Sequence, residues 1–85
     1  MTQSIIDIIN EIKNDKFLVA DDVDMDLLSE YGIDSIELIE ILVKLEKLYN
    51  VRFDISRLKG ETISVRFLET RLKNLLIKQE GKFRE

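Results

Sequence analysis

Apolar residues recur at helical spacing from the start of the chain. The first group consists of four isoleucines, Ile5, Ile8, Ile9 and Ile12. Steps of three and four residues place such a group on one face of a helix, so the pattern predicts a first helix over residues 4–14. Ser4 followed by Asp7 has the form of a capping box, and Thr2 is an alternative N-cap.

The helical pattern ends in an acidic stretch over residues 16–33. Five apolar residues are expected to anchor this stretch to the core: Phe17, Leu18, Val19, Leu27 and Leu28. The alternating aspartates from Asp22 to Asp26 resemble the start of a calcium-binding loop. Such a loop needs glycine at its sixth position and glutamate at its twelfth, where this chain has Leu27 and Ile33. We therefore expect a tethered, solvated loop and no metal site.

The strongest helical pattern covers residues 35–49. Its apolar residues are predicted to face the core: Ile36, Ile39, Leu42, Val43 and Leu45. Charged residues form an exposed stripe of Glu37, Glu40, Lys44 and Lys47. Asp34 as N-cap and Glu37 three residues later complete a capping box, which predicts that the helix begins at Ser35.

The rest of the chain predicts a connector and a last helix. The alternating segment 51–55 has no second strand to pair with, so we interpret it as an extended connector, followed by a short helix at about 56–60. Ser64 is the expected N-cap of a helix that reaches about Gln79. Its apolar residues are Val65, Leu68, Leu72, Leu75 and Leu76. The predicted fold is all-α, a small bundle of three long helices plus a possible short helix.

Composition narrows the class further. The length of 85 residues indicates one domain, which we place at 1–80, followed by a flexible tail at 81–85. The net charge of −4 disfavours nucleic acid as a partner, because phosphate binding needs a basic surface. No apolar run has the length of a membrane span or a signal peptide, so we expect a cytoplasmic monomer that does not enter the membrane. Four basic residues on the last helix are expected mainly to keep it soluble, with a partner contact as the alternative: Arg66, Arg71, Lys73 and Lys78.

Ser35 is the candidate functional residue. A serine nucleophile needs an activating base, and the chain contains no histidine and no cysteine. It also lacks a glycine-rich phosphate loop and a cluster of metal ligands. The serine is therefore interpreted as an attachment point that another enzyme modifies, and the protein is not expected to be an enzyme.

Residues 27–49 resemble the modification site and second helix of acyl carrier proteins. The family motif is leucine, glycine, a variable residue, aspartate, serine and an aliphatic residue. Gly32, Asp34, Ser35 and Ile36 match it in order, and Tyr31 stands where leucine is usual. The length of the chain and its predicted helix order agree with the same family.

This resemblance implies a carrier function. A phosphopantetheinyl transferase would attach 4′-phosphopantetheine from coenzyme A to Ser35, with Asp34 serving the transferase reaction and the helix cap. The thiol of the arm would then carry acyl groups as thioesters. Partner enzymes of fatty acid, polyketide or related secondary-metabolite synthesis would dock at Ile36, Glu37 and Glu40. A ligase or acyltransferase would load the arm, and an acyl chain is expected among Ile39, Leu42, Val43 and Leu68.

Two alternatives remain open at this stage. A peptidyl or aminoacyl carrier is less favoured, because such carriers tend to have a second glycine where this chain has Ile33. The other alternative is an unmodified helical interaction module on the same scaffold, in which Ser35 stays bare. Lys44 and Lys47 differ from the strongly acidic second helix of many family members, which suggests a dedicated set of partner enzymes.

Overall fold

The computed structural model describes residues 1–13, 18–58 and 60–83, the last five of them as backbone only. Three α-helices and two short 3₁₀ helices form this part of the chain: α1 (Thr2–Ile12), η1 (Ala20–Asp22), α2 (Ser35–Tyr49), η2 (Ile55–Leu58) and α3 (Val65–Phe83). No residue in the described ranges belongs to a strand. The predicted all-α class is confirmed, with 3₁₀ segments as the short elements.

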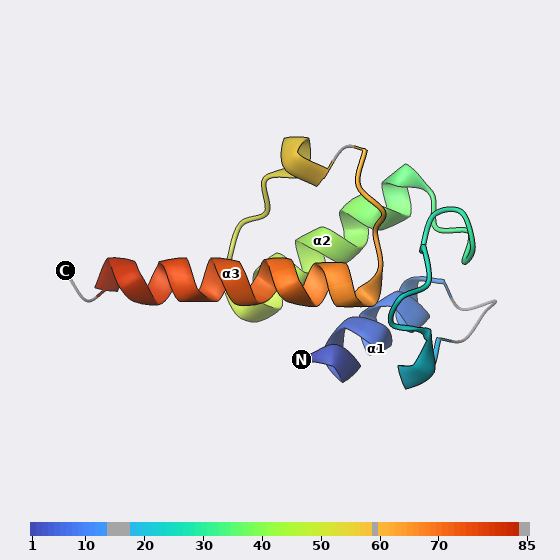
Figure 1. Ribbon diagram of the computed structural model, residues 1–85, viewed down its shortest axis with the longest axis horizontal. Helices are drawn as coiled ribbons and strands as arrows, with labels where there is room; N and C mark the ends of the chain where they lie inside the picture. Colours follow the sequence, from blue (N-terminus) through green and yellow to red (C-terminus); the bar gives the residue numbers. More distant parts are fainter. Residues whose placement is uncertain (14–17, 59, 84–85) are drawn as a thin grey trace.

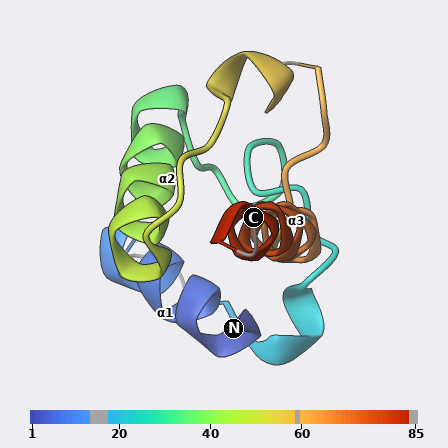
Figure 2. The same cartoon turned by 90° about the vertical axis from the view of Figure 1, so that its left-hand side faces the viewer.

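The three α-helices pack around a shared core. α1 contacts both α2 and α3, and the view along α3 shows α1 and α2 on neighbouring sides of it (Figure 2). The C-terminal half of α3 extends past the other elements (Figure 1). The core contains these buried residues: Ile5, Ile6, Ile9, Leu18, Leu27, Tyr31, Ile33, Ile41, Leu42, Leu45, Phe53, Leu58, Ile63, Val65, Leu68 and Leu72.

The observed helix boundaries agree best with the predicted ones where side chains or backbone groups cap the helix ends. α2 has the predicted bounds. Its C-cap is Asn50, whose φ of 54° is left-handed and whose N–H donates to the carbonyl of Glu46. α1 begins instead at Thr2, with Met1 as its N-cap and no side-chain cap. The capping box predicted at Ser4 was therefore wrong, and so was the alternative N-cap at Thr2.

Other boundaries moved by a few residues. α3 continues to Phe83, beyond the expected end at Gln79, and η2 starts one residue before the predicted short helix. α1 ends at Ile12, and Lys13 has the non-helical backbone of a C-cap, so the predicted end at Asn14 was wrong. Two predictions lie outside the described residues: the anchor Phe17 and the last two residues of the tail. The division into a domain at 1–80 and a tail at 81–85 stays a prediction.

The core-facing side of α2 was partly mispredicted. Ile36 is 71% exposed, and Ile39 and Val43 are 45% and 39% exposed, whereas Ile41 is fully buried. Apolar residues occupy nearly every side of this helix, so spacing alone does not select the buried one. The packing of α1 and α3 selects the side that carries Ile41 and Leu45.

The acidic loop is tied to the start of α3, as expected for a tethered connection. The N–H of Leu27 donates to the carbonyl of Ile63 at 2.8 Å, and the N–H of Arg66 donates to the carbonyl of Val23 at 2.9 Å. The guanidinium of Arg66 also pairs with the carboxylate of Asp24, with Nε and Oδ1 2.6 Å apart. No helix in the described ranges is both long and apolar enough to cross a membrane.

Hydrogen-bond donors face four carboxylates and lower their pKa values in the folded protein. These pairs are Asp24 with Arg66, Asp26 with Ser29, Asp54 with Ser56, and Glu69 with Thr2. A carboxylate whose pKa is lower in the folded state than in the unfolded state binds fewer protons when folded. It therefore stabilises the fold above its unfolded pKa and loses this effect as the pH falls.

We expect acid to destabilise the protein below about pH 4, where the unfolded carboxylates start to take up protons. Thermal unfolding followed by circular dichroism between about pH 7 and pH 3 measures this loss. Arg66→Gln should make the melting temperature fall less steeply with decreasing pH, because the pKa of Asp24 then returns towards its ordinary value. A melting temperature that stays constant down to pH 3 would contradict the assignment of these four carboxylates.

Candidate functional site

The loop before α2 places Ser35 at the first position of that helix, where its side chain is exposed. Gly32 has a φ of 83°, a left-handed conformation that favours glycine. The next residue, Ile33, is buried in the core, and its N–H donates to the carbonyl of Leu27 at 2.9 Å. A buried residue thus fixes the chain two positions before an exposed hydroxyl.

A reciprocal capping box closes the N-terminus of α2. The N–H of Glu37 donates to Oδ1 of Asp34 at 2.7 Å, and the N–H of Asp34 donates to Oε1 of Glu37 at 3.0 Å. Asp34 has the extended backbone of an N-cap, with φ −90° and ψ 177°. The capping box predicted at this position is confirmed, and it fixes the turn that carries Ser35.

Lys13 adds a cation that sequence reasoning missed. Its Nζ lies 3.6 Å from Oε1 of Glu37, and both side chains are 22% exposed. The end of α1 is thereby held against the first turn of α2. Residues 13 and 37 are far apart in the sequence, so no spacing pattern could have revealed the pair.

A turn around Asp26 supports the loop from the other side. Oδ1 of Asp26 accepts the N–H of Leu28 at 3.1 Å, and its Oδ2 accepts the hydroxyl of Ser29 at 2.8 Å. The bond from Ser29 is the main reason why the pKa of Asp26 is lowered, ahead of the opposing effect of desolvation. This aspartate therefore has a local structural role in the loop.

The predicted docking residues differ in how free they are. Ile36 and Glu40 are exposed on α2. Glu37 is half-buried, and its carboxylate is shared between the backbone of Asp34 and the ammonium group of Lys13. Its geometry therefore fits positioning of the helix start better than free contact with a partner, while the docking roles themselves stay predictions.

An apolar groove of about 320 Å³ adjoins Ser35. Its lining comes from the loop, α2, η2 and the segment before α3: Leu28, Ser35, Leu38, Ile39, Leu42, Ile55, Leu58, Gly60, Glu61 and Ile63. Of the four residues expected to line a cargo site, Ile39 and Leu42 do so. Val43 and Leu68 do not: Val43 is 39% exposed but lies outside the lining, and Leu68 is fully buried.

The chemistry of this site fits a phosphate-linked group on the serine. The first amides of a helix have no acceptor within it, and the positive end of the helix dipole favours a negative charge. The charge of Lys13 is paired with Glu37, and the carboxylate of Asp34 opposes a phosphate. Among the residues that the structure describes, no group of three acidic, histidine or cysteine side chains is arranged to hold a metal ion.

Removing the cap should weaken the helix that carries Ser35. Asp34→Ala is expected to lower the free energy of unfolding by about 1 kcal/mol, because the N–H of Glu37 loses its acceptor. Urea unfolding followed by circular dichroism measures the change. Glu30→Ala is the matched control, since it removes an exposed carboxylate from the same loop without a capping role. Equal effects of the two substitutions would contradict the importance of the cap.

Comparisons with known proteins agree with this site. Residues 4–65, well over half of the chain, match the model of a family described as phosphopantetheine attachment site. Comparison with curated proteins and comparison with solved structures gave no match. Domains of this family carry a covalently attached 4′-phosphopantetheine and are generally not catalysts themselves. The chain therefore belongs to the phosphopantetheine-attachment family of carrier domains, in agreement with its resemblance to acyl carrier proteins.

Proposed function

We propose that Ser35 is the attachment residue and that the protein carries acyl groups on a 4′-phosphopantetheine arm at this position. The observation that supports the proposal most strongly is the exposed Ser35 hydroxyl at the start of α2, within the segment that matches the family. A visiting enzyme can reach this hydroxyl without unfolding the domain. The chain has no cysteine, so it has no thiol of its own.

The attachment reaction joins Oγ of Ser35 to the phosphorus that bears the pantetheine portion of coenzyme A. The bond within the diphosphate breaks, adenosine 3′,5′-bisphosphate leaves, and a base of the transferase takes the serine proton. Asp34 keeps the turn in place through the capping box, which presents Oγ in a defined direction. The first amides of α2 would favour the negative charge of the attached phosphate.

The groove beside Ser35 would shelter the cargo. When attached, the arm supplies the thiol that holds an acyl group as a thioester. Leu38, Ile39 and Leu42 offer an apolar wall next to the attachment point. Burying methylene groups of an acyl chain there is favourable by about 0.8 kcal/mol each. The apolar lining, together with Ile33 in place of a second glycine, favours acyl cargo over aminoacyl cargo.

Partner enzymes would approach over the start of α2. Ile36 offers an exposed apolar contact, and Glu40 offers an exposed carboxylate to a basic surface. Such charge pairs speed the encounter more than they fix affinity, which suits a carrier that must visit several enzymes. The expected partners are a transferase, a loading ligase or acyltransferase, and synthase enzymes of fatty acid, polyketide or related secondary-metabolite synthesis.

The test is modification of the purified chain. Incubation with coenzyme A and a broad-specificity phosphopantetheinyl transferase should add the mass of one phosphopantetheine group, read by intact-protein mass spectrometry. Fragmentation of the proteolytic peptide should place the added mass on Ser35. An unchanged mass, with an established carrier protein modified in the same reaction, would overturn the proposal and favour an unmodified interaction module.

A further inference from the structure

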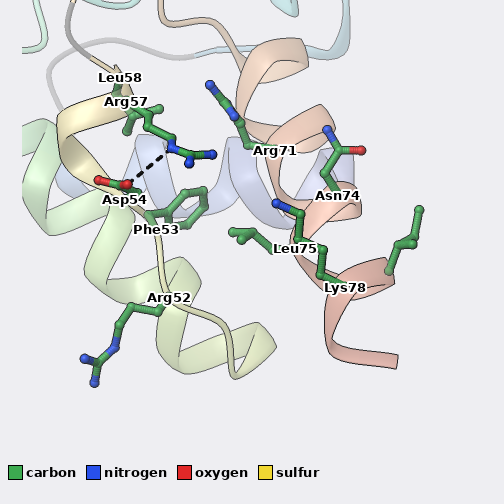
Figure 3. Close-up of a pocket in the computed structure, with 10 residues that line it drawn as sticks. Arg52, Phe53, Asp54, Arg57, Leu58, Arg71, Asn74, Leu75 and Lys78 are labelled. Carbon is green, nitrogen blue, oxygen red and sulfur yellow. Dashed lines mark ion pairs between the residues drawn. The ribbon is translucent and has the colours of Figure 1, made fainter. Parts of the chain in front are cut away.

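A second groove lies away from Ser35, at the other end of α2. It has a volume of about 470 Å³ and is formed by the connector, η2 and the C-terminal half of α3 (Figure 3). The lining residues are Arg52, Phe53, Asp54, Arg57, Leu58, Arg71, Asn74, Leu75, Ile77 and Lys78. We call it the basic groove. Only Leu58 also lines the groove beside Ser35 among the described residues.

Positive charge exceeds negative charge in the basic groove. Arg57 and Lys78 direct their charged ends into the space between η2 and α3, whereas Arg52 points away from it (Figure 3). Arg71 also lines the groove, and its Cζ lies 5.5 Å from the centroid of the Phe67 ring one turn earlier on α3. Asp54 is the one carboxylate in the lining, and it pairs with Arg57 at 3.4 Å. In the part of the chain whose side chains are described, Arg71 and Lys78 have no carboxylate partner within 4.0 Å. This local excess contrasts with the net charge of −4.

The floor of the basic groove is apolar and well supported. Phe53 and Leu58 are each 7% exposed, and Leu75 is half-buried beside them. Phe53 is fixed because its N–H donates to Oε2 of Glu46 at 2.7 Å. Ile77, which is 65% exposed, adds apolar surface to the lining. An occupant would therefore meet both apolar surface and cations.

The spacing of the cations indicates an elongated occupant. Arg71 and Lys78 are seven residues apart on one helix, which is about two turns or 10.5 Å along the axis. Arg57 faces them from η2 across the groove (Figure 3). A single phosphate is too small to reach all three. Carboxylates two turns apart on a helix match this spacing, and apolar side chains on the same face would reach the floor.

We propose that the basic groove binds an acidic amphipathic helix of a partner protein. Charge complementarity supports this occupant over a nucleic acid, because the acidic surface of the rest of the chain would repel a phosphate backbone. It also supports a peptide over a flat anionic membrane, because the cations line a concave surface. The site goes beyond the carrier role at Ser35, since a partner bound here leaves the start of α2 uncovered.

The direct test uses a labelled amphipathic peptide of about 15 residues, long enough to form a helix, with glutamate and leucine on one face. Its binding is measured by fluorescence anisotropy, and the amides that shift are mapped by NMR on the wild-type chain. We expect binding that weakens with salt and shifts confined to residues 52–58 and 71–78. No binding, shifts centred on Ser35, or tighter binding of single-stranded DNA or phosphatidylglycerol vesicles would each overturn the proposal.

Two double variants with the same net charge show whether peptide binding depends on the cations of the basic groove or only on the total charge of the protein. Arg71→Gln/Lys78→Gln should weaken peptide binding about tenfold, because two charge contacts are lost. Lys44→Gln/Lys73→Gln changes the net charge equally, and Lys73 lies on the side of α3 away from the groove, so binding should stay within about twofold of wild type. Equal losses in both pairs would contradict a defined groove. Ser35→Ala should bind normally, which distinguishes failure here from failure of the carrier proposal.

Discussion

Ser35→Ala is expected to abolish phosphopantetheine attachment completely while leaving the fold intact. The substitution removes the only atom of residue 35 that can form the phosphodiester bond. The side chain is exposed and lies outside the core, so the melting temperature should change little. Intact-protein mass spectrometry after incubation with coenzyme A and the transferase measures the loss, and circular dichroism measures the fold.

A second serine variant makes the result specific. Ser56→Ala removes another exposed hydroxyl, one that donates to Oδ1 of Asp54 at 2.6 Å, and it should still be modified fully. Full modification of the Ser35 variant would show that the arm is attached elsewhere. Loss of modification in both variants would point instead to a general defect in recognition by the transferase.

Local signals explain why the start of α2 could be predicted from the sequence. Asp34 and Glu37 are three residues apart, and both halves of their capping box depend only on nearby backbone. The start of α2 followed directly from this pair, and its end followed from the helical spacing of its apolar and charged residues. The exposed position of Ser35 follows from the same turn. The residue that carries the functional proposal was thus predictable without tertiary information.

The buried side of α2, the ion pair at its start and the basic groove depend on tertiary contacts, so they could not be predicted from the sequence. Ile36 and Ile41 are the same residue type on one helix, yet one is exposed and the other is buried, because only one side of α2 meets the rest of the core. The contact between Lys13 and Glu37 joins two helices across a long loop. The basic groove likewise joins segments near residues 55 and 75, and no spacing pattern relates them.

The exposed apolar side of α2 has a physical consequence for the site. Ile36, Ile39 and Val43 expose apolar surface that water does not favour, at spacings that place them on one side of the helix. Ile39 also lines the groove beside Ser35, so this surface continues into the proposed cargo site. These three residues were interpreted as core from their spacing, whereas the structure leaves them exposed.

Leu27→Ala is expected to cause the largest loss of stability of any change near the site, about 2 to 5 kcal/mol. Leu27 is fully buried, so truncation leaves a cavity in the core. Its backbone also joins the two loops, because its N–H bonds to Ile63 and its carbonyl accepts the N–H of Ile33. A domain of this size has a small margin of stability, so this variant should be partly unfolded at moderate temperature.

Leu28→Ala is the matched control for the destabilisation predicted for Leu27→Ala. Leu28 is 38% exposed, so Leu28→Ala should cost less than about 1 kcal/mol, although sequence reasoning gave both leucines the same anchoring role. Urea unfolding measures both free energies, and hydrogen exchange at the Ile33 amide should become faster only when Leu27 is truncated. Since Ile33 precedes the capped turn by one residue, a faster exchange there means that the core holds Ser35 in place through Leu27. Equal costs for the two leucines would show that the loop is anchored elsewhere.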